Sequence, residues 1–132
     1  MPVEPSAAPA SLPISALPRI GELIDGAQDI LKADISRIKQ LLVDPDAILP
    51  QPIVAFTLQE AKDALDLLAV HARQLAAWQK ESISDAQRAE IVRLRTLIPH
   101  IRPLIQRLIA LATALDRRAQ GGGTWPRRKW RH

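Results

Sequence analysis

The sequence predicts an all-α protein. An antiparallel helical hairpin with a kinked second helix and a further N-terminal helix should form a three-helix, bundle-like domain with extended N- and C-terminal arms. Three observations predict this. Ala, Leu and Ile dominate the apolar 47% of the 132 residues, which favours helices over strands. Apolar residues recur at spacings of three and four along three segments. Prolines precede the first two segments, and glycines follow the third.

Proline and glycine positions predict the domain boundaries. Residues 1–18 hold five prolines among Ala and Ser, so we expect an extended, polyproline-like arm. Residues 19–118 should form the helical domain and residues 119–132 a glycine-hinged tail. Within the domain we expect helices at about 19–43, 57–81 and 84–118, with a proline-rich connector over 44–56. This connector could span about 40 Å, so the first helix could run parallel or antiparallel to the second.

One acidic residue stands on the apolar stripe of the first helix. Asp34 falls among the Ile and Leu residues that should face the core. Either its carboxylate lies at the edge of the stripe and reaches water, or it is buried and paired with an Arg of the third helix, which would fix the register.

The start of the second helix is predicted from a capping box. Thr57 and Glu60 have the required spacing, and Phe56 is placed to pack against Ala61 as a hydrophobic staple. The same signal predicts the start of the third helix at Ser84 and Gln87. Because only a few residues separate these two helices, we expect them to form an antiparallel hairpin.

The third helix carries the most regular apolar pattern in the chain. Its spacings alternate between three and four, as in the seam of a coiled coil. The seam comprises Ile91, Leu94, Ile98, Ile101, Ile105, Leu108, Ala112 and Leu115. A second row, Leu97, Leu104 and Leu111, widens the face to about 160°, which predicts two neighbouring helices and favours self-association. Pro99 and Pro103 lie on the polar side and predict a kink; a break near Ile98 is the alternative.

The C-terminal tail should stop the helix and meet a partner. Gly121, Gly122 and Gly123 are expected to end the third helix and act as a hinge. The residues that follow combine cations with indole rings, and we assign partner docking to Trp125, Arg127, Arg128, Lys129, Trp130 and Arg131. Large aromatic surface outside a core is expected to be covered by a partner.

Basic residues concentrate in the C-terminal part of the chain. Residues 1–83 carry 7 basic and 11 acidic side chains, whereas residues 84–132 carry 11 basic and 3 acidic ones. Four arginines in phase along one face of the third helix form a candidate polyanion stripe, namely Arg88, Arg95, Arg102 and Arg117. Such a stripe could bind phosphates or solvate the helix.

No constellation of residues predicts catalysis, a metal or a cofactor. The three histidines, His71, His100 and His132, lie on different segments, and Cys is absent. His71 is expected to pack at the rim of the helix pair. The sequence contains neither a span long enough for a bilayer nor a convincing signal peptide. We therefore expect a cytoplasmic location, or one within a particle assembled in the cytoplasm.

These features favour a non-catalytic structural subunit. We expect it to self-associate through its helices and to be tied by its arms into a large assembly of protein subunits, such as a virion-like particle, a secretion machine or a ribonucleoprotein. The alternative is a small nucleic-acid-binding protein that uses the tail and the arginine stripe.

Overall fold

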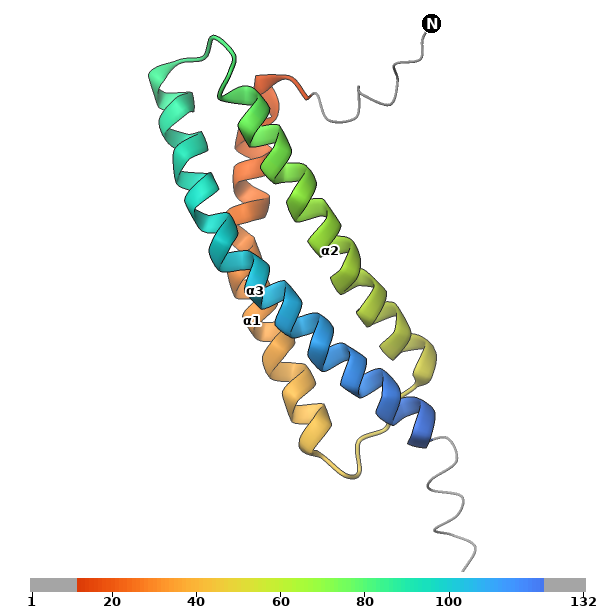
Figure 1. The fold of residues 1–132 in the computed structure, drawn as a ribbon. Coiled ribbons are helices and arrows are strands. Elements are labelled where there is room, and N and C mark those ends of the chain that lie inside the picture. The colour runs from red at the N-terminus through yellow and green to blue at the C-terminus, as the bar shows by residue number, and fades with distance from the viewer. Residues whose placement is uncertain (1–11, 123–132) are drawn as a thin grey trace, which may run out of the picture.

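The three predicted helices are present in a computed structural model, which describes residues 12–122. A short 3-10 helix, Ile14–Ala16, leads into α1 (Leu17–Val43), which is followed by α2 (Gln51–Trp78) and α3 (Asp85–Gly122). The described residues contain no strand, so the all-α prediction is confirmed. Connections at opposite ends make α2 antiparallel to both α1 and α3 (Figure 1).

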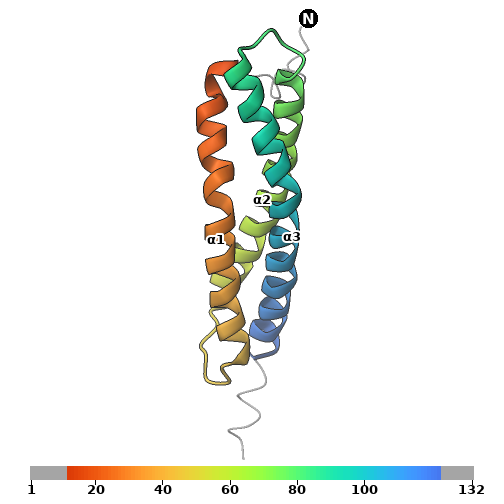
Figure 2. The same cartoon turned by 90° about the vertical axis from the view of Figure 1, so that its left-hand side faces the viewer.

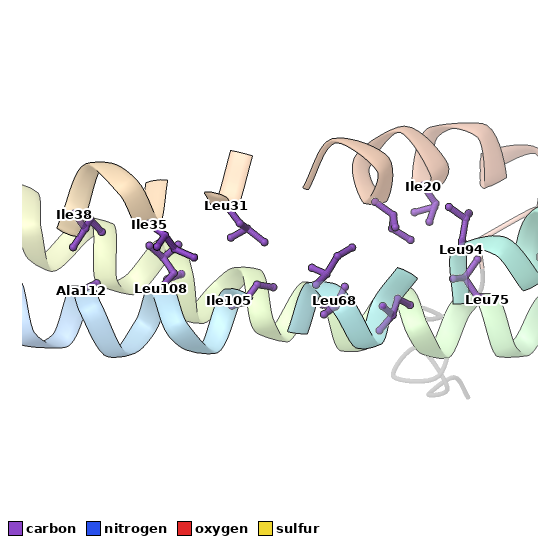
Figure 3. Packing of buried hydrophobic residues seen from close by; sticks show 14 of the residues in the cluster. Ile20, Leu31, Ile35, Ile38, Leu68, Leu75, Leu94, Ile105, Leu108 and Ala112 are labelled. Carbon is purple, nitrogen blue, oxygen red and sulfur yellow. The ribbon is translucent and has the colours of Figure 1, made fainter. Parts of the chain in front are cut away.

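The third helix is the centre of the bundle. Both α1 and α2 pack mainly against α3, and the turned view shows the three helices side by side along most of their length (Figure 2). The predicted seam of α3 is buried throughout, from Ile91 to Leu115. Figure 3 shows side chains from all three helices, such as Ile20, Leu75 and Leu94, pointing into one core. The wide apolar face of α3 therefore receives its two neighbours within the same chain.

Helix α3 starts at the predicted capping box. The Ser84 amide donates a hydrogen bond to Gln87 Oε1 at 2.9 Å, and the Gln87 amide donates to Ser84 Oγ at 3.0 Å. This reciprocal pair is the predicted capping box, which satisfies two amides at the helix start. Pro99 and Pro103 lie on the exposed side of one continuous helix, so α3 does not break near Ile98. Figure 1 shows a bend between the two halves of α3.

The second helix starts six residues before the predicted position. It begins at Gln51, with Pro52 in its first turn, where a missing amide hydrogen costs no helical bond. Thr57 is therefore inside the helix, and its hydroxyl donates to the Ile53 carbonyl at 3.0 Å instead of capping an end. Phe56 is 63% exposed and does not act as a staple. The predicted connector over 44–56 thus shrinks to residues 44–50.

The outer ends of α1 and α3 also differ from the prediction. Helix α1 begins at Leu17, which is buried, so the last residues of the predicted arm belong to the domain. At the other end, Gly121 and Gly122 continue α3 and do not stop it. No glycine of the described residues has a positive φ, so a left-handed cap is not used here. Gly123 lies outside the described residues.

The carboxylate on the stripe of α1 lies at its edge. Asp34 is partly exposed and pairs with Arg37, one turn along the same helix. The alternative of a buried pair with an arginine of α3 is wrong.

Two hydrogen bonds tie the N-terminal segment to the end of α2. The Leu12 amide donates to Gln74 Oε1, and Trp78 Nε1 donates to the Leu12 carbonyl, both at 2.8 Å. Gln74 and Trp78 are buried, so these bonds satisfy polar groups that water does not reach. Residues 12 and 13 therefore cross the end of α2 before α1 begins.

At the opposite end, α3 fastens the connector. The Arg118 guanidinium donates to the carbonyls of Leu41, Leu42 and Asp44, which are free because α1 ends there. The side-chain Nε2 of Gln51 donates to Asp116 Oδ1 at 3.1 Å, which joins the start of α2 to the same turn of α3. The last turns of α3 thus lie beside both ends of the connector.

Candidate interaction surface

An apolar groove runs between α1 and α2 and has α3 as its floor. It encloses about 220 Å³. Its walls come from Leu23, Ala27, Ile30 and Leu31 of α1 and from Ala64, Leu67, Leu68 and His71 of α2, and Ile101 and Ile105 lie at its base. The groove exists because α1 and α2 both pack on α3 and make few contacts with each other. One corner of the bundle is therefore open.

The rims of the groove expose aliphatic side chains. Leu23, Ile30 and Leu67 are 49%, 62% and 50% exposed. Leu23 and Ile30 are seven residues apart and lie on one side of α1, and Leu67 stands across from them on α2. The apolar patterns of α1 and α2 are thus wider than α3 alone can cover. The sequence predicts two neighbouring helices only for the third helix, so this groove was not predicted.

His71 is the one titratable side chain in the wall of this groove. It is buried, and its imidazole has no hydrogen-bond or ion-pair partner among residues 12–122. Burial disfavours the charged form and holds the pKa of His71 below its ordinary value of 6.5. The side chain is therefore neutral at physiological pH and acts as part of an apolar wall, not at a rim.

Stability should consequently fall on mild acidification. Below pH 6.5 the unfolded chain binds a proton at His71 that the folded chain binds only at lower pH, so the free energy of unfolding decreases across that interval. Urea denaturation at a series of pH values should show this slope. Replacing His71 with Leu should flatten it, whereas His100→Gln, at an exposed histidine, should not. Equal slopes in all three proteins would contradict the assignment.

The predicted seam residues serve the interior of the chain. Leu94, Ile98, Ile101, Ile105, Leu108 and Leu115 are all at most 5% exposed and contact α1 or α2. They are therefore not on an outer surface where another copy could reach them without opening the bundle.

The arginine stripe is exposed, but half of it is used within the hairpin. Arg88 donates to the Gln79 carbonyl at 3.1 Å, and Arg95 donates to the Gln79 side-chain oxygen. Both bonds close the turn between α2 and α3. Arg102 and Arg117 are exposed and have no side-chain partner within residues 12–122.

A second, cationic groove lies between α1 and α3 and was not predicted. It encloses about 600 Å³. Lys32, Lys39 and Arg107 border it, and Ile35 and Leu104 form its apolar floor. Sequence spacing places Lys32 and Lys39 seven residues apart on α1, but the contribution of α3 depends on how the helices pack.

The predicted docking residues of the tail lie outside the described residues. This applies to Trp125, Arg127, Arg128, Lys129, Trp130 and Arg131. Within residues 12–122, no group of three His, Asp or Glu side chains could hold a metal ion. In the same part of the chain, no helix combines the length and the apolar character needed to cross a bilayer.

The chain matches no protein-family model, no curated protein and no solved structure. Its function is therefore inferred from the physical properties of its surface.

Proposed function

We propose that this chain is a non-catalytic interaction subunit that self-associates through the groove between α1 and α2. The exposed aliphatic rims of that groove, Leu23, Ile30 and Leu67, carry the proposal. Exposed aliphatic side chains along an apolar groove are typical of a surface that another protein covers.

The shape of the groove suits a helix. Two antiparallel helices form its walls and a third forms its floor, as three members of a four-helix bundle would. An amphipathic helix placed there would interdigitate with Leu23 and Ile30 on one side and Leu67 on the other. Recognition by apolar anchors one and two turns apart is the usual way in which a groove binds a helix.

A second copy of the chain is the simplest source of that helix. Two copies that face each other would each bring the apolar rims of α1 and α2, so one patch would serve both sides of an isologous interface. Each copy would cover the side chains that the other leaves exposed. The N-terminal arm would then connect such dimers to a larger assembly of protein subunits.

The lining of the groove supports a binding role more than a catalytic one. Its single titratable group is a neutral imidazole among aliphatic side chains. General acid–base catalysis needs polar groups that orient a substrate, and this lining offers few. Nucleic-acid binding through the arginine stripe is supported less well, because Arg88 and Arg95 already bind Gln79.

Sedimentation of the full chain and its variants tests this proposal. Wild type should sediment as a dimer at tens of micromolar and dissociate on dilution. Leu67→Glu should weaken the dimer by at least about tenfold, because the interface would bury a charge that lacks a partner. Val92→Glu is the matched control, since Val92 is 48% exposed on α3 and does not line the groove.

Two outcomes would contradict the proposal. A monomer at all accessible concentrations would remove self-association, and equal effects of the two substitutions would remove the groove from the interface. If the chain instead binds nucleic acid with an affinity that falls steeply with salt, the alternative function is favoured, because phosphate contacts release counterions.

A further inference from the structure

The surface around the start of α2 is both apolar and acidic, and it ends one helical turn before Leu67, which lies on the same face of α2 at the groove rim. Ile53 and Phe56 are each 63% exposed, and Ile48 in the connector is 87% exposed. Glu60 and Asp63 continue the same side of α2, because spacings of three and four keep residues on one helix face. We call Ile53, Phe56, Glu60 and Asp63 the α2 base.

The carboxylates near this end have no cationic partner in the described part of the chain. Asp63 accepts a hydrogen bond from the side-chain Nε2 of Gln59, and the Asp44 carboxylate accepts one from the Asp46 backbone amide. No ion pair within residues 12–122 involves Asp44, Asp46, Glu60 or Asp63. Four carboxylates without an ion-pair partner in the described residues therefore lie at the connector and along the α2 base.

The C-terminal segment starts beside this surface. Arg118 contacts the Asp44 carbonyl and Asp116 contacts Gln51, so the last turns of α3 lie against the connector and the start of α2. Ten residues follow Gly122, and their sequence GTWPRRKWRH holds two tryptophans and four Arg or Lys residues. The described part of α3 thus ends next to four carboxylates and an exposed apolar patch, and the residues that follow it in the sequence include four cations and two tryptophans.

The segment is long enough to reach the whole surface. Ten extended residues span about 33 Å. The helix from Gln51 to Asp63 is about 18 Å long, and α3 continues for about 9 Å beyond Asp116. A tail that turns back at Gly123 could therefore reach the level of Phe56 near its middle and that of Asp63 with its last residues.

We propose that residues 124–132 dock on the α2 base of their own chain. Trp125 and Trp130 cover Ile53 and Phe56, while the four cations face the carboxylates of the connector and α2. Aromatic anchors surrounded by complementary charges are the usual chemistry of such contacts. This docking uses none of the rim residues Leu23, Ile30 and Leu67 of the groove, although Asp63 lies one turn from Leu67 on the same face of α2.

Paramagnetic relaxation in the full-length chain tests this docking. The natural sequence contains no cysteine, so His132→Cys places a single spin label at the end of the tail. In a ¹⁵N-labelled protein, the amide signals of residues 53–63 should be lost through broadening. They should return when Glu60 and Asp63 are both replaced by Lys. Glu22→Lys with Glu81→Lys is the matched control, because it makes the same charge change far from the tail and should leave the broadening intact.

A mixed sample separates docking within one chain from docking between chains. Spin-labelled ¹⁴N protein is combined with unlabelled ¹⁵N protein, and broadening over residues 53–63 should be absent. Its presence would mean that the tail binds a second copy, which overturns the proposal. The proposal would also be overturned if the broadening persists after Glu60 and Asp63 are replaced. A tail that stays close to α2 without docking would cause broadening that does not depend on these two residues. Both proteins in the mixed sample carry Leu67→Glu, so that contacts across the proposed dimer do not add to the broadening.

Discussion

The Leu94→Asp variant is expected to lose most or all of its folded population. Leu94 is fully buried in α3, where Figure 3 shows it near Ile20 of α1 and Leu75 of α2. A carboxylate there lacks both water and a cationic partner, which costs about 3–5 kcal/mol. Small domains have total stabilities of about 5–15 kcal/mol, so one such charge removes a large part of the total.

Circular dichroism during thermal unfolding measures this effect. Val92→Asp is the control, since it introduces the same carboxylate two residues away at a half-exposed position. The control should melt near the wild-type temperature, whereas Leu94→Asp should show low helicity or a greatly lowered midpoint. A small change in Leu94→Asp would mean that α1 and α2 do not enclose this part of α3.

Replacing Trp78 with Ala should have the second largest effect. Trp78 is the largest fully buried side chain, and its indole also donates the hydrogen bond to the Leu12 carbonyl. Truncation of a buried Trp to Ala typically costs about 3–5 kcal/mol through lost packing and the cavity that remains. In addition, the Leu12 carbonyl loses its donor, so the N-terminal crossing of α2 should loosen.

Trp78→Phe separates the packing of the ring from the hydrogen bond. Phe keeps most of the aromatic packing but cannot donate, so the free energy of unfolding should fall mainly by the value of one hydrogen bond, about 1 kcal/mol. Urea denaturation gives both values. Hydrogen exchange should be accelerated at the Leu12 amide in both variants, because the bond between Trp78 and Leu12 holds the segment in place. If exchange at Leu12 is unchanged in Trp78→Phe, the crossing does not depend on that bond.

The sequence predicted the parts of the fold that depend on regular spacing. The seam from Ile91 to Leu115 and the Ser84–Gln87 cap follow from local patterns, and both are confirmed. The predicted start of α2 is wrong because Pro50 and Pro52, which led to the prediction of a connector, are compatible with the first turn of a helix. A proline in the first turn lacks only an amide that would have no partner there, so Gln51 can begin the helix. Thr57 and Glu60 have the spacing of a capping box, but both residues lie inside α2.

The candidate groove could not be predicted from local patterns. The groove exists because α1 and α2 both pack against α3 and not against each other, which leaves Leu23 and Leu67 on facing rims. The hydrogen bonds of Arg118 and Leu12 with residues more than 60 positions away likewise have no signal in the sequence. The spacing of apolar residues in the sequence gives the width of the apolar face of each helix. The packing of the helices determines which part of that face remains exposed.

The pairing of α1 with α3, the last helix of the chain, has a consequence for biosynthesis. The ribosome synthesises α1 first, whereas α3 is synthesised only after α2 and the hairpin turn. Translation proceeds at about 5–20 residues per second. For several seconds the apolar stripe of α1, including Ile20, Ile24 and Leu31, has no surface to pack against. Nascent chains that stall before residue 94 should therefore be bound by chaperones, and release should require the synthesis of α3.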